Sequence, residues 1–221
     1  MVSTRSFDIS PSTSVANVRL NVYSVERSLR FYRDLLGFQV IGKSSEDNAL
    51  LAPIDSNNKN LLLQLSRVDT SHRVIEGEQS PIRQAGLYHF AILLPSRRHL
   101  ANIFRHLTEN SNQLYFEGAA DHSVSESLYF KDPDSNGVEI YRDRVQSKWK
   151  RSSQFQVEMK TDHLNLEQLL REGEDQIKWR MPSDTVIGHV HLHVSDLIKS
   201  RNFYSEILGL HHTCSYSGAN F

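Results

Sequence analysis

Two stretches of the chain, residues 15–38 and 187–210, carry the same order of apolar and polar positions. Each begins with apolar residues at every second position, the period of a β-strand, and continues with apolar residues three or four positions apart, the period of an α-helix. The helical stripe of the first stretch consists of Val25, Leu29, Tyr32 and Leu36. Ser24 and Ser195 precede the two helices and are the expected N-caps, and a glycine follows each helix as its expected end.

The two stretches are an internal repeat. Eight of 24 aligned positions are identical, whereas average residue usage gives roughly one match in sixteen by chance. The identical pairs are Val18/Val190, Leu20/Leu192, Val22/Val194, Ser28/Ser200, Phe31/Phe203, Tyr32/Tyr204, Leu36/Leu208 and Gly37/Gly209. Both copies therefore predict a strand, a turn and a helix.

The predicted strand and helix are each the beginning of a longer unit. Two complete units are present, in residues 13–67 and 85–145. In the first, the helix is followed by three short strands in the runs "FQVIG", "NALLAP" and "NLLLQLS". The second has a strand in "GLYHFAILL", a helix from about Ser96 to Leu107, and a hairpin whose turn is "DPDSNG". A polar stretch, residues 67–84, separates the two. We expect an α+β fold in which these two βαβββ units form a first domain, residues 13–145.

The remainder of the chain predicts a connector and an incomplete third unit. Residues 146–185 are charged and contain one short helix, in "NLEQLLREG". The third unit occupies residues 186–221, which hold a strand, a helix and the beginning of another strand. Because its helix lacks a complete sheet to cover, we expect weak ordering beyond Gly209 and self-association, for example as a homodimer.

Composition narrows the class of protein. The formal net charge of -1 gives no electrostatic reason to expect nucleic acid or an anionic membrane as a partner. The single cysteine, Cys214, cannot form an internal disulfide, which suits a reducing compartment. The sequence shows neither a signal-peptide core nor an 18-residue apolar run. We expect a soluble, cytoplasmic protein.

The strand "VIGHVHLHV" places three imidazoles on one face. His189, His191 and His193 stand at every second position, so their side chains point to the same side of a strand. Such a face is either exposed to water or part of a polar cup, and taken alone the first reading is the more common.

The second unit contains further candidates for chemistry. His89 stands in an almost wholly apolar strand, so it is expected to be buried and to need a partner. Glu139 shares one face of the last strand with Tyr141, whereas Tyr129 lies in the preceding strand and His122 shortly before it. Taken singly, each residue also has an ordinary structural explanation. His89 fits a core histidine and Glu139 half of a surface ion pair, while His122 fits a loop residue and Tyr129 a core aromatic.

Their spacing is more informative. His122, then Leu128-Tyr129, Asp132-Pro133 and Glu139 resemble the signature of extradiol ring-cleavage dioxygenases. Those enzymes belong to the vicinal oxygen chelate superfamily, which also contains glyoxalase I and the fosfomycin- and bleomycin-resistance proteins, and the βαβββ unit is its building block. The chain is most similar to the catechol 2,3-dioxygenase-like group. It differs in Ser135, where the signature prefers glycine or proline, in Ala120, and in having no fourth unit.

The resemblance implies a cup formed by two paired units, with a divalent metal held by two histidines and one glutamate. Carried over, the ligands are His89, Glu139 and a first-strand histidine from the partnering unit. That residue is His189 if units two and three pair, because the first unit offers only Asn17, a poor ligand, at the equivalent place.

The resemblance also implies further roles. His122 would bind a substrate oxygen or move a proton, and Tyr129 would hold the same oxygen. His191, His193 and Tyr141 are expected to line the substrate.

The expected function is an extradiol dioxygenase that uses Fe(II), or alternatively Mn(II), to cleave a small aromatic diol with O2. Two alternatives remain open. A glyoxalase-like lyase or isomerase would use the same ligands with Ni(II) or Zn(II) and no O2. A binding protein of the resistance type would have an apolar cup without metal.

Overall fold

The computed structural model describes residues 8–55, 60–68, 85–110, 114–153, 156–175, 178–216 and 218–221. The first unit contains β1 (Val18–Val22), α1 (Val25–Leu29) with its π-helical continuation η1 (Arg30–Leu35), β2 (Gln39–Ile41), β3 (Asn48–Ala52) and β4 (Leu63–Arg67). Its strands form one sheet in the order β1-β4-β3-β2, with β1 parallel to β4. Ser24 caps α1 as predicted, since its side chain accepts a hydrogen bond from the Arg27 amide.

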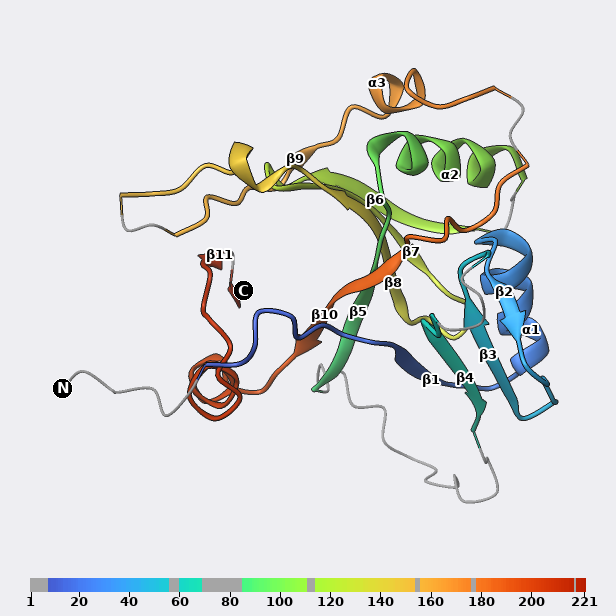
Figure 1. The fold of residues 1–221 in the computed structure, drawn as a ribbon, viewed down its shortest axis with the longest axis horizontal. Coiled ribbons are helices and arrows are strands. Elements are labelled where there is room, and N and C mark those ends of the chain that lie inside the picture. The colour runs from blue at the N-terminus through green and yellow to red at the C-terminus, as the bar shows by residue number, and fades with distance from the viewer. Residues whose placement is uncertain are drawn as a thin grey trace, which may run out of the picture.

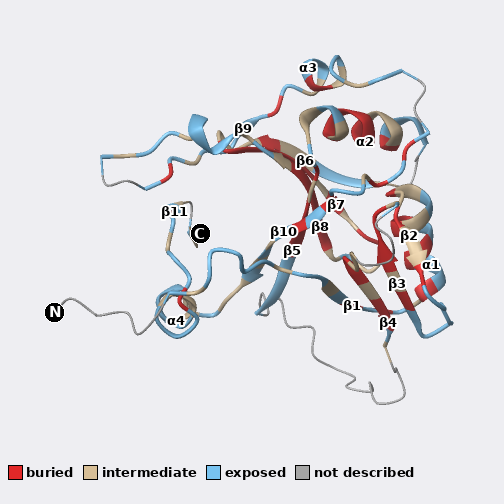
Figure 2. Cartoon of the chain, in the orientation of Figure 1, coloured by how far each residue is buried: buried red, intermediate tan, exposed pale blue. Residues whose placement is uncertain are grey.

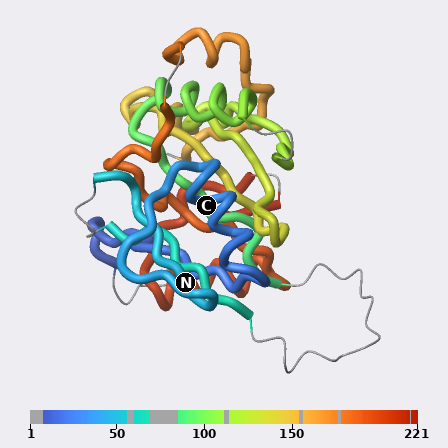
Figure 3. The backbone as a smooth tube through the Cα atoms, turned by 90° about the vertical axis from the view of Figure 1, so that its right-hand side faces the viewer, coloured from blue at the N-terminus to red at the C-terminus, as the bar shows by residue number. Residues whose placement is uncertain are grey.

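The second unit repeats this order. It contains β5 (Gly86–Leu93), α2 (Arg97–Asn110), β6 (Tyr115–Asp121), β7 (Ser125–Lys131) and β8 (Gly137–Asp143), and β5 is parallel to β8. The segment after β8 adds the short η3 (Gln146–Lys148), β9 (Asp162–His163) and α3 (Leu166–Leu170). In two views at right angles α3 lies over α2 at one end of the molecule (Figures 1 and 3).

The third unit begins with β10 (Val186–His193), which joins the sheet of the second unit in the order β10-β5-β8-β7-β6-β9. It continues with α4 (Leu197–Asn202), η4 (Phe203–Ile207) and a hairpin of β11 (Ser215–Tyr216) and β12 (Ala219–Asn220). The expectation that Ser195 caps α4 is wrong. Asp196 is the N-cap, because its carboxylate accepts from the amides of Ile198 and Lys199.

The core forms where α1 and α2 cover one face of each sheet, and buried residues follow these helix–sheet contacts (Figure 2). The predicted stripes of both helices are buried; the α2 stripe consists of Leu100, Ile103, Phe104 and Leu107. The apolar residues of α4 and η4 are different: Ile198 and Ile207 are 67% and 61% exposed. The opposite face of the larger sheet carries polar side chains, among them His89, Ser127 and Glu139. The α+β class expected from the sequence is confirmed.

Polar contacts fix the first helix against the β7–β8 turn. The hydroxyl of Tyr32 donates to Asp132 Oδ2 at 2.8 Å, and both residues are buried. The Asp132 carboxylate also accepts from the backbone of Asp134 and from the backbone and side chain of Asn136. Arg27 pairs with Asp134. The turn that leads into β8 is therefore held from both units.

Residues 69–84, most of the polar stretch noted in the sequence, lie outside the described residues. Within the described part of the chain, no helix has the length and apolar character needed to cross a bilayer.

Candidate metal centre

The pairing of β10 with β5 brings the third unit to the second. The two strands are antiparallel, with His189 opposite Ala91 and His191 opposite His89. On the other edge of β5, Ala91 lies opposite Glu139 of β8. Paired residues share a face of a sheet, so His189, His89 and Glu139 all point to the side away from α2.

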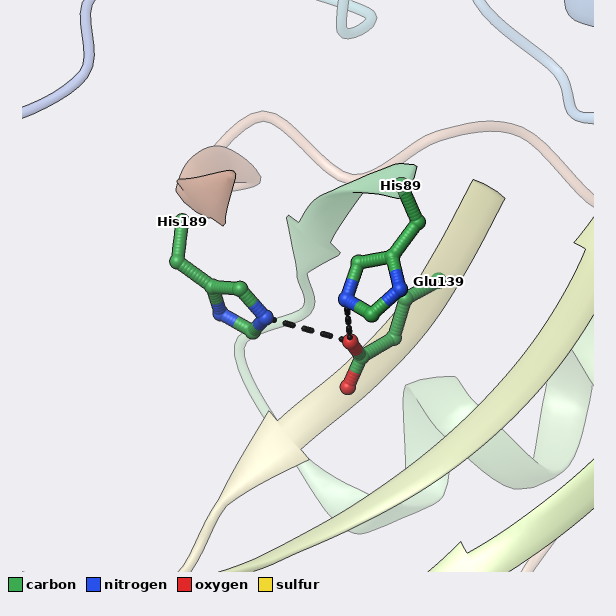
Figure 4. A group of neighbouring side chains, drawn as sticks. All are labelled: His89, Glu139 and His189. Atoms are coloured by element: carbon green, nitrogen blue, oxygen red, sulfur yellow. Dashed lines mark hydrogen bonds and ion pairs between the residues drawn. The ribbon is translucent and has the colours of Figure 1, made fainter. Parts of the chain in front are cut away.

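The three side chains converge on one point (Figure 4). Nε2 of His89 lies 2.9 Å from Oε2 of Glu139, and Nε2 of His189 lies 3.1 Å from the same oxygen. One potential ligand atom from each residue lies within 4.8 Å of the others. His89 and Glu139 are buried, and His189 is half-buried.

The geometry fits a divalent ion better than a hydrogen-bonded cluster. Although Nε2 of His89 is close to Glu139, it is buried and makes no hydrogen bond in the described structure, because the two groups are not aligned for one. Two ligands about 2.1 Å from an ion and at right angles to each other lie about 3.0 Å apart, close to both separations from Oε2. Two imidazoles and one carboxylate are also the donors of the facial triad found in non-haem iron oxygenases.

Electrostatics keep Glu139 ionised. Burial alone would raise the pKa of its carboxyl group, but the hydrogen bond of His189 and the nearby charges of His189 and His89 outweigh burial and hold that pKa well below its usual range. The carboxylate is therefore available as a ligand at any physiological pH.

Residues behind the three side chains hold them in place. The hydroxyl of Ser127, on β7, donates to Oε1 of Glu139 at 2.6 Å and is fully buried. The Tyr141 hydroxyl lies 3.4 Å from Nδ1 of His189. Ser127 was not predicted at the site, although it stands two residues before Tyr129 and strand alternation places it on the same face.

His122 and Tyr129 form a hydrogen-bonded pair beside the centre. Nδ1 of His122 lies 2.8 Å from the Lys160 carbonyl, which can only accept, so this nitrogen carries the proton in the neutral ring. Nε2 therefore accepts from the Tyr129 hydroxyl at 2.8 Å. The Tyr129 ring lies 5.8 Å from that of His89, and burial, followed by the charge of Glu139, raises the pKa of the phenol.

His191, His193 and Tyr88 form one wall of the site. The ring of His191 meets that of His89 edge-on at 4.9 Å. Burial, followed by the charges of His89 and His189, lowers the pKa of His191 to about 4, so its ring is neutral at pH 7. The ring of Tyr88 lies 4.6 Å from that of His193.

Tyr88 was not predicted at the site. Simple alternation would put it on the face opposite His89, but a β-bulge interrupts the register between His191/His89 and Leu192/Leu87, and Tyr88 is the extra residue. Its ring consequently contacts both His89 and His191, at 5.2 and 5.1 Å. No local signal in the sequence marks this bulge.

Two glycines permit the close approach of strands at the centre. A Cβ on Gly188 would lie 1.9 Å from the Tyr141 hydroxyl, and one on Gly137 would lie 2.2 Å from the Tyr88 carbonyl and 2.8 Å from Cβ of His89. Asn17 of the first unit is exposed and precedes β1, whose sheet shares no described strand with the site.

Comparisons with known proteins show which family this chain resembles. Residues 14–140 match the model of the Glyoxalase/Bleomycin resistance protein/Dioxygenase superfamily. The chain is 40% identical over 210 residues to a catechol-2,3-dioxygenase of Bacillus subtilis (strain 168), covering 95% of this chain and 70% of the relative.

Two solved structures are similar to this chain, and the first of them shows the same fold. A dioxygenase candidate from Bacillus subtilis subsp. subtilis str. 168 covers 92% of this chain and 57% of its own, with a TM-score of 0.55 at 11% identity. A glyoxalase/dioxygenase from Nostoc punctiforme covers 64% of this chain and 100% of its own, with a TM-score of 0.47 at 18% identity.

Proposed function

The chain belongs to the Glyoxalase/Bleomycin resistance protein/Dioxygenase superfamily, and on that basis we propose that it is a metal-dependent extradiol dioxygenase acting on a catechol-type ring. In this reaction the carbon–carbon bond beside the diol breaks. Both atoms of O2 enter the product, which carries a new aldehyde and a new carboxylic acid.

The convergence of His89, Glu139 and His189 carries the proposal. The three residues come from β5, β8 and β10, and their meeting point contains a buried imidazole nitrogen without a hydrogen-bond partner. A purely structural cluster would leave that nitrogen unsatisfied at a cost, whereas a metal ligand uses its lone pair.

We assign the metal to these three side chains and name Fe(II) as the expected ion. When bound, it supplies a Lewis acid and a template that hold a diol and O2 side by side. Ser127 and Tyr141 orient Glu139 and His189 for this task through the contacts described above.

His122 and Tyr129 are placed to handle the proton of the substrate hydroxyl. Nε2 of the neutral His122 accepts from the Tyr129 hydroxyl in the structure; when the diol replaces that hydrogen bond, the same nitrogen can take a proton that the diol loses and later return it. The Tyr129 phenol stays protonated at neutral pH and can donate a hydrogen bond to the same substrate oxygen. His191 and His193 would position the ring from the β10 side.

The test is oxygen-dependent ring cleavage by protein purified and loaded anaerobically with Fe(II), and in parallel with Mn(II), Ni(II) and Zn(II). We expect catechol to consume one O2 per ring opened with Fe(II) or Mn(II). His89→Ala and His189→Ala should lower both bound metal and turnover at least 100-fold, and His163→Ala, an exposed histidine on β9, should change neither.

Two results would contradict the proposal. One is isomerisation of a glutathione hemithioacetal without O2, which would identify a lyase. The other is metal content that survives His189→Ala while His89→Ala abolishes it, since the third ligand would then lie elsewhere.

A further inference from the structure

Lys131 places a positive charge at one end of the candidate site. We propose that Lys131, together with Tyr88, forms a subsite for an anionic substituent of the ring, so that the substrate is an aromatic diol bearing a carboxylate. This inference rests on the proposed function and specifies its substrate class.

The register of the sheet puts Lys131 on the same face as the candidate ligands. Lys131 lies opposite Gly137, which lies opposite His89 on the next strand. Because Gly137 has no side chain, the lysine stem can cross over β8 toward β5. Its Nζ accordingly lies 5.9 Å from the centre of the Tyr88 ring, which belongs to β5.

The balance of charges at the proposed site favours a negatively charged group beside Lys131. On the site-bearing face of β5, β7, β8 and β10, strands that are described throughout, Lys131 is the single lysine or arginine. A divalent ion, the Glu139 carboxylate and a singly ionised diol sum to zero charge. A carboxylate on the ring would add an uncompensated negative charge unless Lys131 faces it.

The present partner of Lys131 is easily replaced. Its ammonium group lies 3.6 Å from Oε2 of Glu117, and the two side chains are 25% and 38% exposed. A long, partly hydrated ion pair of this kind contributes little. Glu117 is the extra residue of a bulge in β6, between the positions where Phe116 and Gly118 pair with β7. A substrate carboxylate can therefore take its place.

Tyr88 supplies the apolar side of the subsite. The bulge in β5 turns its ring toward His89, His191 and His193, and the ring is 44% exposed. An aromatic substrate held at the metal centre would meet this ring at its outer edge, beside the lysine.

The experiment compares 3,4-dihydroxybenzoate with its neutral isostere 3,4-dihydroxybenzamide. Binding is measured anaerobically by calorimetry, which needs no turnover, and kcat/KM is measured with the Fe(II)-loaded enzyme. We expect the acid to be preferred about tenfold or more by both measures. Lys131→Met should remove that preference, Lys131→Arg should retain most of it, and Glu117→Gln should increase it several-fold.

The matched control is Lys43→Met, an exposed lysine of the first unit, which should leave the preference as it is. The subsite is refuted if the wild-type protein binds the amide as tightly as the acid, or if the preference survives in Lys131→Met. Failure of the proposed function looks different. No diol would then be cleaved with any metal, while the calorimetric preference would still decide the role of Lys131.

Discussion

Replacing Ser127 by alanine tests how the candidate metal centre is supported. The Ser127 hydroxyl is the hydrogen-bond donor to Oε1 of Glu139, at 2.6 Å, while the two histidines face Oε2. Ser127 is fully buried and Glu139 is 3% exposed, so water cannot readily substitute for the lost donor. The change removes one oxygen atom and leaves the packing of the strand almost unaltered.

The magnitude follows from the kind of hydrogen bond. A hydrogen bond to a buried charged group contributes about 1.5–3 kcal/mol to the free energy of unfolding. For a chain of this length, that loss lowers the melting temperature by roughly 3–12 °C. Metal affinity should fall about 10–100-fold, because the carboxylate is no longer held in one orientation.

Two measurements check these expectations. Thermal unfolding of the metal-free protein reports the lost hydrogen bond, and competition with a chromophoric chelator reports metal affinity. Ser125→Ala is the matched control, since Ser125 is a buried serine on the same strand and the same face but lies opposite Asp143, away from Glu139. If Ser127→Ala binds metal within twofold of the wild type and melts at the same temperature, the orienting role is wrong.

Two further predictions concern the β7–β8 turn. Tyr32→Phe removes one hydrogen-bond donor from the buried Asp132 carboxylate, so the free energy of unfolding in urea should fall by about 1.5–3 kcal/mol. The control is Tyr23→Phe, at an exposed tyrosine, which should change that free energy by nothing measurable. Equal effects of the two changes would refute a stabilising role of the Tyr32–Asp132 hydrogen bond. Ser135 has a φ of 65°, in the left-handed region, so Ser135→Gly should stabilise the protein by about 0.5–1 kcal/mol after the extra chain entropy of glycine is counted. A loss of stability in that variant would show that the serine side chain matters more than its backbone strain.

The sequence predicts the repeated elements well, because each depends on local periodicity. The strands and helices that were located in the first two units lie where alternation and helical spacing place them, although β6 was not located, and the buried stripes of α1 and α2 are the predicted ones. His89, Glu139 and His189 could be grouped from the repeat and the resemblance, and the structure brings them together. Their role as metal ligands stays a prediction.

Other features depend on contacts between segments that are distant in the sequence, so no local sequence pattern predicts them. The position of Tyr88 follows from a bulge that simple alternation cannot reveal. The Tyr32–Asp132 contact joins residues 100 positions apart, so neither residue alone marks it. At α4, Ser195 and Asp196 are both good N-caps, and only the hydrogen bonds of the folded chain decide for Asp196.

The spacing of the three candidate ligands has a consequence for the order in which the protein assembles. Glu139 lies 50 residues after His89, and His189 another 50 residues after Glu139. During synthesis, β5 and β8 can pair as soon as the second unit has emerged, whereas β10 is synthesised later and must then return to pair with β5. His89 and Glu139 would then lie close together before β10 has formed, and the pairing of β10 with β5 would bring His189 to them. If the three residues bind a metal ion as proposed, the ion would stabilise the pairing of β10 with β5, because it would bind the assembled site and not the unfolded chain.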